Sequence, residues 1–241
     1  MLLSTPPRTK SPSFKTNDTK PTSPRTASLI SGVSLVIMFF VAMYSEMLIR
    51  TSMIIPNDSE TTRNNIKQNE MKFQSGLVGY LIILLCDVIS SISMYQVFKS
   101  ISAVLSCWVA GLRMIYSVIF GWAIWQLFRG YFMLFNDHGK DFMEFFARYE
   151  SIWAFGLMIF GWHLFFLSML ARRSNFVAPW IGVMTGVAGI AYFVDNLLKL
   201  TYSEYENVKT LLNIGVAIPA IVGEVGLAVA FISHYAKSRK H

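Results

Sequence analysis

The fold is decided by uncharged apolar stretches, and the clearest is residues 151–171, which read SIWAFGLMIFGWHLFFLSMLA. This stretch holds 21 residues without a formal charge, and residues 174–194 form a second such stretch of 21. About 20 residues of helix match the hydrocarbon core of a bilayer, which is about 30 Å thick. Both stretches therefore predict helices that cross a membrane.

Outward from this pair, apolar segments recur along almost the whole chain. Strand-like alternation is absent, and backbone groups in lipid must be hydrogen-bonded within a helix or a closed barrel, so we predict helices. The fold class is therefore all-α, a polytopic membrane bundle over 28–236 with six transmembrane helices at 28–49, 76–98, 101–127, 151–171, 178–200 and 211–235. Only 15% of the residues are charged, against about 25% in soluble domains, which excludes a soluble enzyme.

The charges outside these segments predict the orientation of the chain. Residues 1–27 form a basic tail rich in Ser, Thr and Pro, which we expect to be disordered, and residues 237–241 form a basic C-terminus. The side that holds both termini carries 11 basic residues and one acid, a net charge of +10, and the other side carries eight against nine, a net of −1. The positive-inside rule then predicts a multi-pass inner-membrane protein with both termini in the cytoplasm. Nucleic acid is not an expected partner, because the basic residues flank spans instead of forming one patch.

Ionisable residues inside the spans are the candidate functional residues. Asp87, Arg113, His163 and Glu224 each lie near the middle of a different span, and Asp195 lies nearer the end of the fifth. A charge at the bilayer centre costs about 2.5–3.5 kcal/mol on insertion scales, so we expect these groups to face one another. The sequence pairs Arg113 with Asp87 or with Glu224 and leaves both open. Such a cluster is either a ligand or proton site or a structural salt-bridge network.

Several other features are structural in our interpretation. Gly182, Gly186 and Gly189 predict a face of the fifth helix that packs closely on a neighbour. Asp195 and Lys199 are spaced as an i,i+4 ion pair. A single histidine among the clustered residues is too few for a dimetal site, and we expect no metal.

The connecting segments carry helix signals of their own. Asp141 to Glu144 forms a capping-box pattern before Phe142, Phe145, Phe146 and Tyr149. This spacing predicts a short interfacial helix with its aromatic face toward lipid or over the mouth of the bundle. Residues 57–59 predict the start of another short helix that runs to Lys72.

The order of motifs along the chain resembles a known family. The matching stretches are Phe73-Gln-Ser-Gly76, Asp87, Met94-Tyr95, Arg113, Phe160-Gly-Trp-His163-Leu164, Pro179-Trp-Ile-Gly182, Gly189-Ile-Ala-Tyr192-Phe-Val-Asp195 and Gly223-Glu224. From about residue 28 to 236 the chain resembles the bacterial membrane family named domain of unknown function 4386. The resemblance implies a six-helix membrane fold and points to the same five ionisable residues, Asp87, Arg113, His163, Asp195 and Glu224. It does not indicate a mechanism or a cofactor.

Three functions are compatible with this sequence. The first is binding of a small polar or amphipathic ligand, such as a lipid, a quinone-like molecule or a proton-coupled solute, at the cluster of ionisable residues. The second is a non-catalytic accessory subunit that packs through the glycine face. The third is an intramembrane enzyme with His163 as general base, although no catalytic motif supports an enzyme. Expected partners are membrane lipids, a hydrophobic small molecule, and a membrane protein or a second copy.

Overall fold

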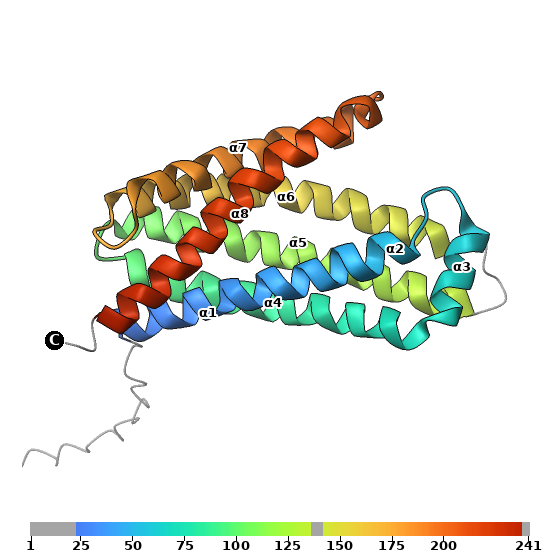
Figure 1. Ribbon diagram of the computed structural model, residues 1–241, viewed down its shortest axis with the longest axis horizontal. Coiled ribbons are helices and arrows are strands. Elements are labelled where there is room, and N and C mark those ends of the chain that lie inside the picture. The colour runs from blue at the N-terminus through green and yellow to red at the C-terminus, as the bar shows by residue number, and fades with distance from the viewer. Residues whose placement is uncertain (1–22, 136–141, 238–241) are drawn as a thin grey trace, which may run out of the picture.

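The structure, a computed structural model, describes residues 23–135 and 142–237, and it is built of helices (Figure 1). In chain order they are α1 (Pro24–Ala42), the π-helix η1 (Met43–Arg50), α2 (Thr51–Met53), α3 (Ser59–Gln68), α4 (Glu70–Phe98), α5 (Ala103–Phe135), α6 (Phe142–Arg173), α7 (Pro179–Thr201) and α8 (Tyr205–Lys237). No strand occurs within the described ranges. The all-α prediction is confirmed.

Six of these helical stretches are long and apolar enough to cross a membrane, as the sequence predicted. The first is continuous from Pro24 to Met53 and comprises α1, η1 and α2. It begins four residues inside the segment expected to be a tail, whose residues 1–22 lie outside the described part of the chain. α5 and α8 have 33 residues each, so at 1.5 Å per residue they are about 50 Å long and extend beyond a bilayer core.

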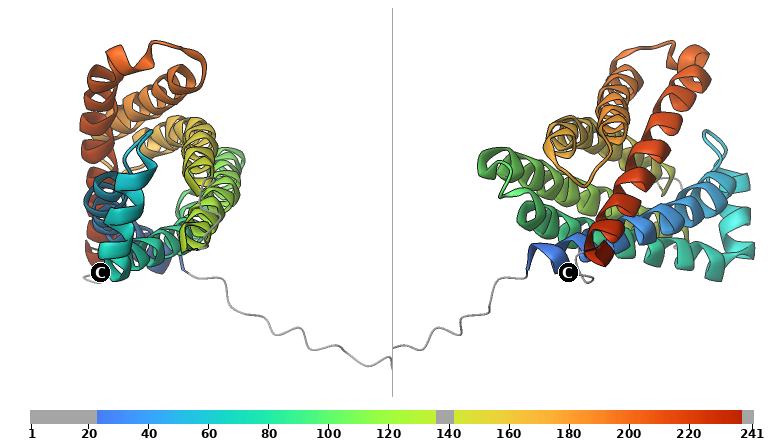
Figure 2. Two further views of the ribbon diagram at one scale, coloured as in Figure 1. Left: turned by 90° about the vertical axis from the view of Figure 1, so that its right-hand side faces the viewer. Right: turned by 60° about the vertical axis from the view of Figure 1, so that its left-hand side comes forward.

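The six long helices form a closed ring when the bundle is viewed along its axis (Figure 2). α1 packs against α4, and α4, α5, α6, α7 and α8 then follow in order until α8 returns to α1. The turns at 99–102 and 174–178 are short, so α4 with α5 and α6 with α7 form antiparallel hairpins. Side chains from every long helix can therefore meet in the interior of the ring.

Local sequence signals explain where several helices begin. The Ser23 hydroxyl accepts a hydrogen bond from the Thr26 amide, and Pro24 occupies the first helical position, where its missing N–H is harmless. The Asp58 carboxylate caps α3 by accepting from the Thr61 amide at 2.9 Å. The helix predicted from residues 57–59 to Lys72 is thus present, but it ends at Gln68 because α4 starts at Glu70.

The predicted interfacial helix at 142–149 is wrong as a separate, lipid-facing element. These residues are the first two turns of α6, and the aromatic side chains of Phe142, Phe145, Phe146 and Tyr149 are buried in the bundle. The helix continues because no Gly or Pro interrupts it before the apolar span. Phe146 packs directly on Gly130 of α5, where no side chain stands in its way.

The glycine face of α7 packs against α6 of the same chain. A Cβ built at Gly189 would lie 2.6 Å from the Gly161 carbonyl oxygen, and one built at Gly182 would lie 2.5 Å from Cγ of Arg172. At Gly186 the neighbour is Ser168, again on α6. The predicted packing role is therefore met within the chain, and this face is not open to an accessory partner.

The two ends of the bundle differ in charge. The first residue of α1 and the last of α8 lie at one end, together with the turns 99–102 and 174–178 (Figure 1). Its described cations are Arg25, Lys99, Arg172, Arg173 and Lys237, and its described helix ends and turns contain no Asp or Glu. We call it the basic end, and the end that carries α3 the distal end.

Candidate functional site

Arg113 of α5 lies in the interior of the ring and joins three of the predicted residues. Its Nη2 donates to Oδ1 of Asp87 on α4 at 2.7 Å, and its Nη1 lies 3.1 Å from Nε2 of His163 on α6. All three residues are at most 2% exposed. Of the two pairings left open by the sequence, Arg113 adopts the one with Asp87. We call Asp87, Arg113, His163 and the nearby Glu224 the midplane cluster.

The hydrogen bonds of His163 determine which nitrogen carries its proton. Nδ1 lies 2.9 Å from the Val109 carbonyl oxygen, which can only accept, so Nδ1 carries the hydrogen. Nε2 then accepts from the Arg113 guanidinium, which can only donate. The ring is a neutral imidazole with both nitrogens in use, and it holds Arg113 in position.

The remaining contacts of Arg113 leave one donor unused. Nη2 also lies 3.5 Å from Sδ of Met38 on α1, and the guanidinium stacks over the Phe160 ring at 5.5 Å from its centroid. Nε is buried and has no hydrogen-bond partner within the described chain. A buried donor without a partner is energetically costly.

Glu224 of α8 faces the same interior but stands apart from the pair. The charges of Arg113 and Asp87 act on its carboxylate, yet it makes no hydrogen bond or ion pair with any residue that the structure describes. The residue is half-buried, unlike the three sealed members of the cluster. Tyr192 of α7 is also half-buried, interacts electrostatically with Glu224, and packs edge-on against Phe160.

Asp195 lies elsewhere, and its predicted pair with Lys199 is wrong. Its carboxylate accepts a hydrogen bond from the Tyr205 hydroxyl at 2.8 Å, which braces the turn between α7 and α8. Lys199 instead extends toward α6, where its Nζ lies 3.5 Å from Oε2 of Glu150. The short local pair loses to longer-range partners because α6 and the start of α8 bring better-placed groups to each side chain.

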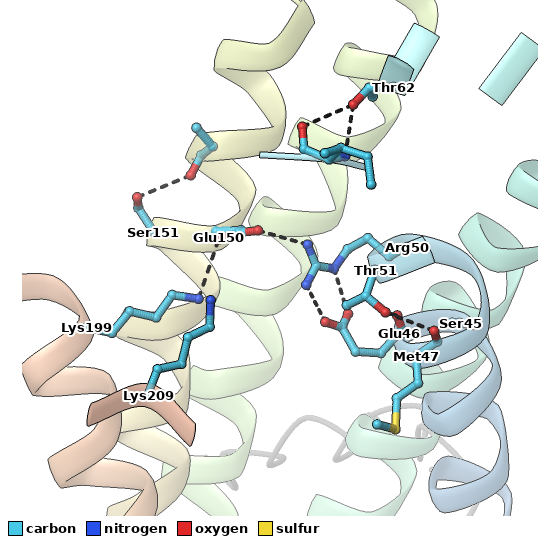
Figure 3. Close-up of polar contacts among 12 residues, drawn as sticks. Ser45, Glu46, Met47, Arg50, Thr51, Thr62, Glu150, Ser151, Lys199 and Lys209 are labelled. Atoms are coloured by element: carbon cyan, nitrogen blue, oxygen red, sulfur yellow. Dashed lines mark hydrogen bonds and ion pairs between the residues drawn. The ribbon is translucent and has the colours of Figure 1, made fainter. Parts of the chain in front are cut away.

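A second polar network, which the sequence did not predict, lies toward the distal end (Figure 3). Arg50 donates Nε to Oε2 of Glu46 at 2.8 Å and Nη1 to Oε1 of Glu150 at 2.9 Å. The Tyr80 hydroxyl donates to Glu46 at 2.5 Å, and Lys199 completes the network through Glu150. We call these five residues the distal network. It joins η1, α4, α6 and α7.

One part of the distal network had a visible signal in the sequence. Glu46 and Arg50 are four residues apart, the spacing of a local ion pair. Nothing local connects them to Glu150, which is 100 residues further along the chain from Arg50. Arg50 of η1 and Glu150 of α6 come together only in the folded ring, in which α1 packs against α4 and α8.

The described residues contain no group of three or more His, Cys, Asp or Glu side chains arranged to hold a metal ion. The midplane cluster has one imidazole, whose two nitrogens are occupied, and two carboxylates, of which Asp87 is already paired with Arg113. Its chemistry is that of hydrogen bonding and charge pairing.

Fold and site together define a multi-pass helical membrane protein with ionisable residues in the interior of its ring. A family model matches residues 30–232, and its description is "Domain of unknown function (DUF4386)". The chain belongs to this family, as its motifs indicated. It is also similar to a protein of Archaeoglobus fulgidus named "Uncharacterized protein", with 26% identity over 125 residues, or 52% of this chain and 67% of the relative. No solved structure matches the chain.

Proposed function

We propose that the chain binds a small polar or amphipathic ligand at the midplane cluster, with Glu224 as the contact residue. The observation that carries the proposal is the state of this carboxylate. Glu224 lies mid-span, is half-buried and has no hydrogen bond or ion pair within the described residues. Ionisable groups in membrane spans are costly and usually mark a ligand or ion pathway, so an unpartnered one favours a ligand.

Each residue of the cluster has a role in this proposal. Glu224 accepts a hydrogen bond from a donor group of the ligand, such as an amine or a hydroxyl, and Tyr192 borders the same space. Arg113 contributes a positive charge that acts on Glu224. Asp87 and His163 are positioning residues, because they hold the guanidinium and are themselves sealed. His163 has no free nitrogen for general-base catalysis, which favours binding over an enzyme.

The arrangement of α8 supports an amphipathic ligand. Between residues 206 and 219 α8 buries no side chain, whereas Ala220, Gly223, Leu227 and Phe231 further along are buried. Toward the distal end α8 diverges from α1 (Figures 1 and 2). Glu224 lies just past the point where the packing begins. A molecule with an apolar portion could reach the carboxylate along this half of α8 from the lipid.

The location that we propose is the inner membrane, with both termini in the cytoplasm. The basic end carries five described cations and no described acid, and the distal end carries charges of both signs. Positive charge is retained preferentially on the cytoplasmic side during insertion.

The first test measures ligands that copurify with the protein. Wild type, Glu224→Gln and Glu206→Gln are purified in mild detergent, extracted with organic solvent and compared by mass spectrometry. Glu206 is the matched control, since it is an exposed acid on the same helix and pairs with Lys209. We expect a copurified species in wild type and Glu206→Gln that is depleted in Glu224→Gln. Equal recovery from all three, with lower thermal stability of Glu224→Gln alone, would mean that the cluster is structural.

The second test compares carboxylates within one molecule by labelling with an apolar carbodiimide. Because Glu224 is half-buried and has no hydrogen bond or ion pair within the described residues, while Asp87 is sealed against Arg113, we expect modification of Glu224 and not of Asp87. Peptide mapping by mass spectrometry identifies the modified residue. Labelling of Asp87 in preference to Glu224 would contradict the assignment of Glu224 as the accessible group.

A further inference from the structure

A cavity at the basic end is lined by polar side chains and is separate from the midplane cluster. It has a volume of about 280 Å³ and is bounded by Asn175, Phe176, Ser233, His234 and Lys237. The first two come from the turn between α6 and α7, and the other three from the last turns of α8. Two elements from different parts of the chain thus shape it.

The polar groups around this cavity are not used for folding. The side chains of Asn175, Ser233, His234 and Lys237 make no hydrogen bond or ion pair with any other residue in 23–135 or 142–237. All four can donate hydrogen bonds, and Lys237 carries a positive charge. A cavity bordered by several donors without partners among the described residues is suited to an acceptor group with several oxygens.

The surrounding charge selects an anion. The described helix ends and turns at this end hold Arg25, Lys99, Arg172, Arg173 and Lys237 without an acid, and Arg25 is close enough to act electrostatically on His234. A cationic ligand would be repelled here. An anion would meet a field of one sign together with the donors of the cavity.

The depth of the cavity and its aromatic wall indicate where the anion resides. The apolar run of α8 ends at Ile232, so Ser233, His234 and Lys237 lie where a membrane changes from hydrocarbon to headgroups. The Phe176 ring stacks on His234 with centroids 4.3 Å apart. It also packs against the fully buried Phe98 and Phe231. These contacts place the imidazole at the border of the cavity.

We propose that this cavity binds a phosphate group, with Lys237 and His234 as the principal contacts and Ser233 and Asn175 as additional donors. Phosphate presents several strong acceptor oxygens and negative charge, which match the donors and the field. The same chemistry is offered by the headgroup of an anionic phospholipid and by a soluble phosphate compound. The site is independent of the proposed ligand at Glu224.

The test is an equilibrium titration of the purified full-length protein in a nonionic detergent, followed by isothermal calorimetry. The probes are dihexanoyl phosphatidic acid, dihexanoyl glycerol as the same molecule without phosphate, and inorganic phosphate. The variants are Lys237→Gln and His234→Gln, and the matched control is Lys99→Gln, which removes one charge from the same end without lining the cavity.

We expect saturable binding of phosphatidic acid to wild type and to Lys99→Gln, and none of dihexanoyl glycerol. Lys237→Gln should weaken binding about tenfold, the effect of losing one charge-assisted hydrogen bond, and His234→Gln should weaken it in the same direction. Binding of phosphatidic acid alone identifies a lipid headgroup site, and additional Lys237-dependent binding of inorganic phosphate identifies a site for soluble phosphate compounds. Absence of saturable binding, or an equal loss in Lys99→Gln and Lys237→Gln, would overturn the proposal and leave only general charge attraction.

Discussion

The midplane cluster and the distal network use similar residue types in different surroundings. In the midplane cluster the side chains of Arg113 and Asp87 are each 3% exposed. In the distal network the side chain of Arg50 is 11% exposed and that of Glu150 is 37% exposed. The Arg113–Asp87 pair joins the consecutive helices α4 and α5, whereas Arg50 and Glu150 are 100 residues apart in the sequence. The two pairs also differ in their access to solvent.

This difference decides what each ion pair contributes. Burial removes the hydration of both charges of the midplane pair, so the attraction between them is largely offset by desolvation. The pair then adds little net stability, yet a lone charge left behind is very unfavourable. In the distal network, solvent screens the attraction and compensates a lost partner, so both the gain and the loss are small. The midplane cluster therefore specifies one arrangement of helices, because other arrangements would leave a buried charge unpaired. The distal network makes only a small contribution to the stability of that arrangement.

The largest expected effect is therefore on removal of one midplane partner. Arg113→Leu should lower the free energy of unfolding by about 3–5 kcal/mol, because Asp87 is left as an unpaired buried carboxylate. The measurement is chemical unfolding in detergent, followed by circular dichroism. The double variant Asp87→Leu/Arg113→Leu removes both charges and should recover much of the loss. If the double variant is as unstable as the sum of both single variants, the burial argument is wrong.

A smaller effect is expected in the distal network. Glu150→Gln removes the ion pairs to Arg50 and Lys199, and we expect a loss of about 1 kcal/mol or less that shrinks further at high salt. The same unfolding measurement at low and high ionic strength checks this. Glu144→Gln is the control, since Glu144 pairs with Arg148 on the exposed surface of α6, and its replacement should have almost no effect. If Glu150→Gln lowered the free energy of unfolding as much as Arg113→Leu does, and independently of salt, the distal network would not differ from the midplane cluster in the way we infer.

The smallest effect is expected at α3, outside the membrane spans. The hydrogen bonds from Thr61 lower the pKa of Asp58 below its usual value of 3.8. Because the pKa of Asp58 is lowered in the folded protein, the ionised cap stabilises α3 fully at pH values above the ordinary pKa of an aspartate. This stabilisation is lost as the pH falls through the lowered pKa of Asp58. The protection factors of the α3 amides, which compare their exchange rates with those of an unfolded chain at the same pH, should therefore fall below about pH 4. Asp58→Asn retains an acceptor without the titration, so its exchange should lack this acid-dependent step.

The sequence predicted the fold and the residues of the midplane cluster for one physical reason. Insertion into lipid has a free-energy cost that each residue contributes separately. The length and apolarity of a span, and a charged residue within it such as Arg113, can therefore be recognised in the sequence without knowledge of tertiary contacts. The sequence could not show that Arg113 pairs with Asp87 and not with Glu224, because this depends on how α4 and α8 are rotated about their axes in the ring. Glu150 and Lys199 were missed for the same reason, since their partners come from other helices.

The aromatic residues of the first turns of α6 show a different limit. Their helical spacing was correctly identified, but the same apolar face fits lipid or the interior of a bundle equally well. What decides between them is the length of α5, which extends to Phe135 and presents Gly130 to Phe146. Periodicity reports which side chains share a face, not what covers that face.

The π-helix η1 determines the helical phase of the first span. Met38, before η1, contacts Arg113 in the interior, and Arg50, at its end, meets Glu150 on α6. In a regular α-helix each residue advances the direction of the side chains by about 100°, so the phase at one end fixes the phase at the other. The wider turns of η1 relax this constraint, much as an inserted residue would. Deleting one residue within Met43–Arg50 would turn the guanidinium of Arg50 away from Glu150 while leaving Met38 in place. The first span therefore serves both polar regions through one local change of winding.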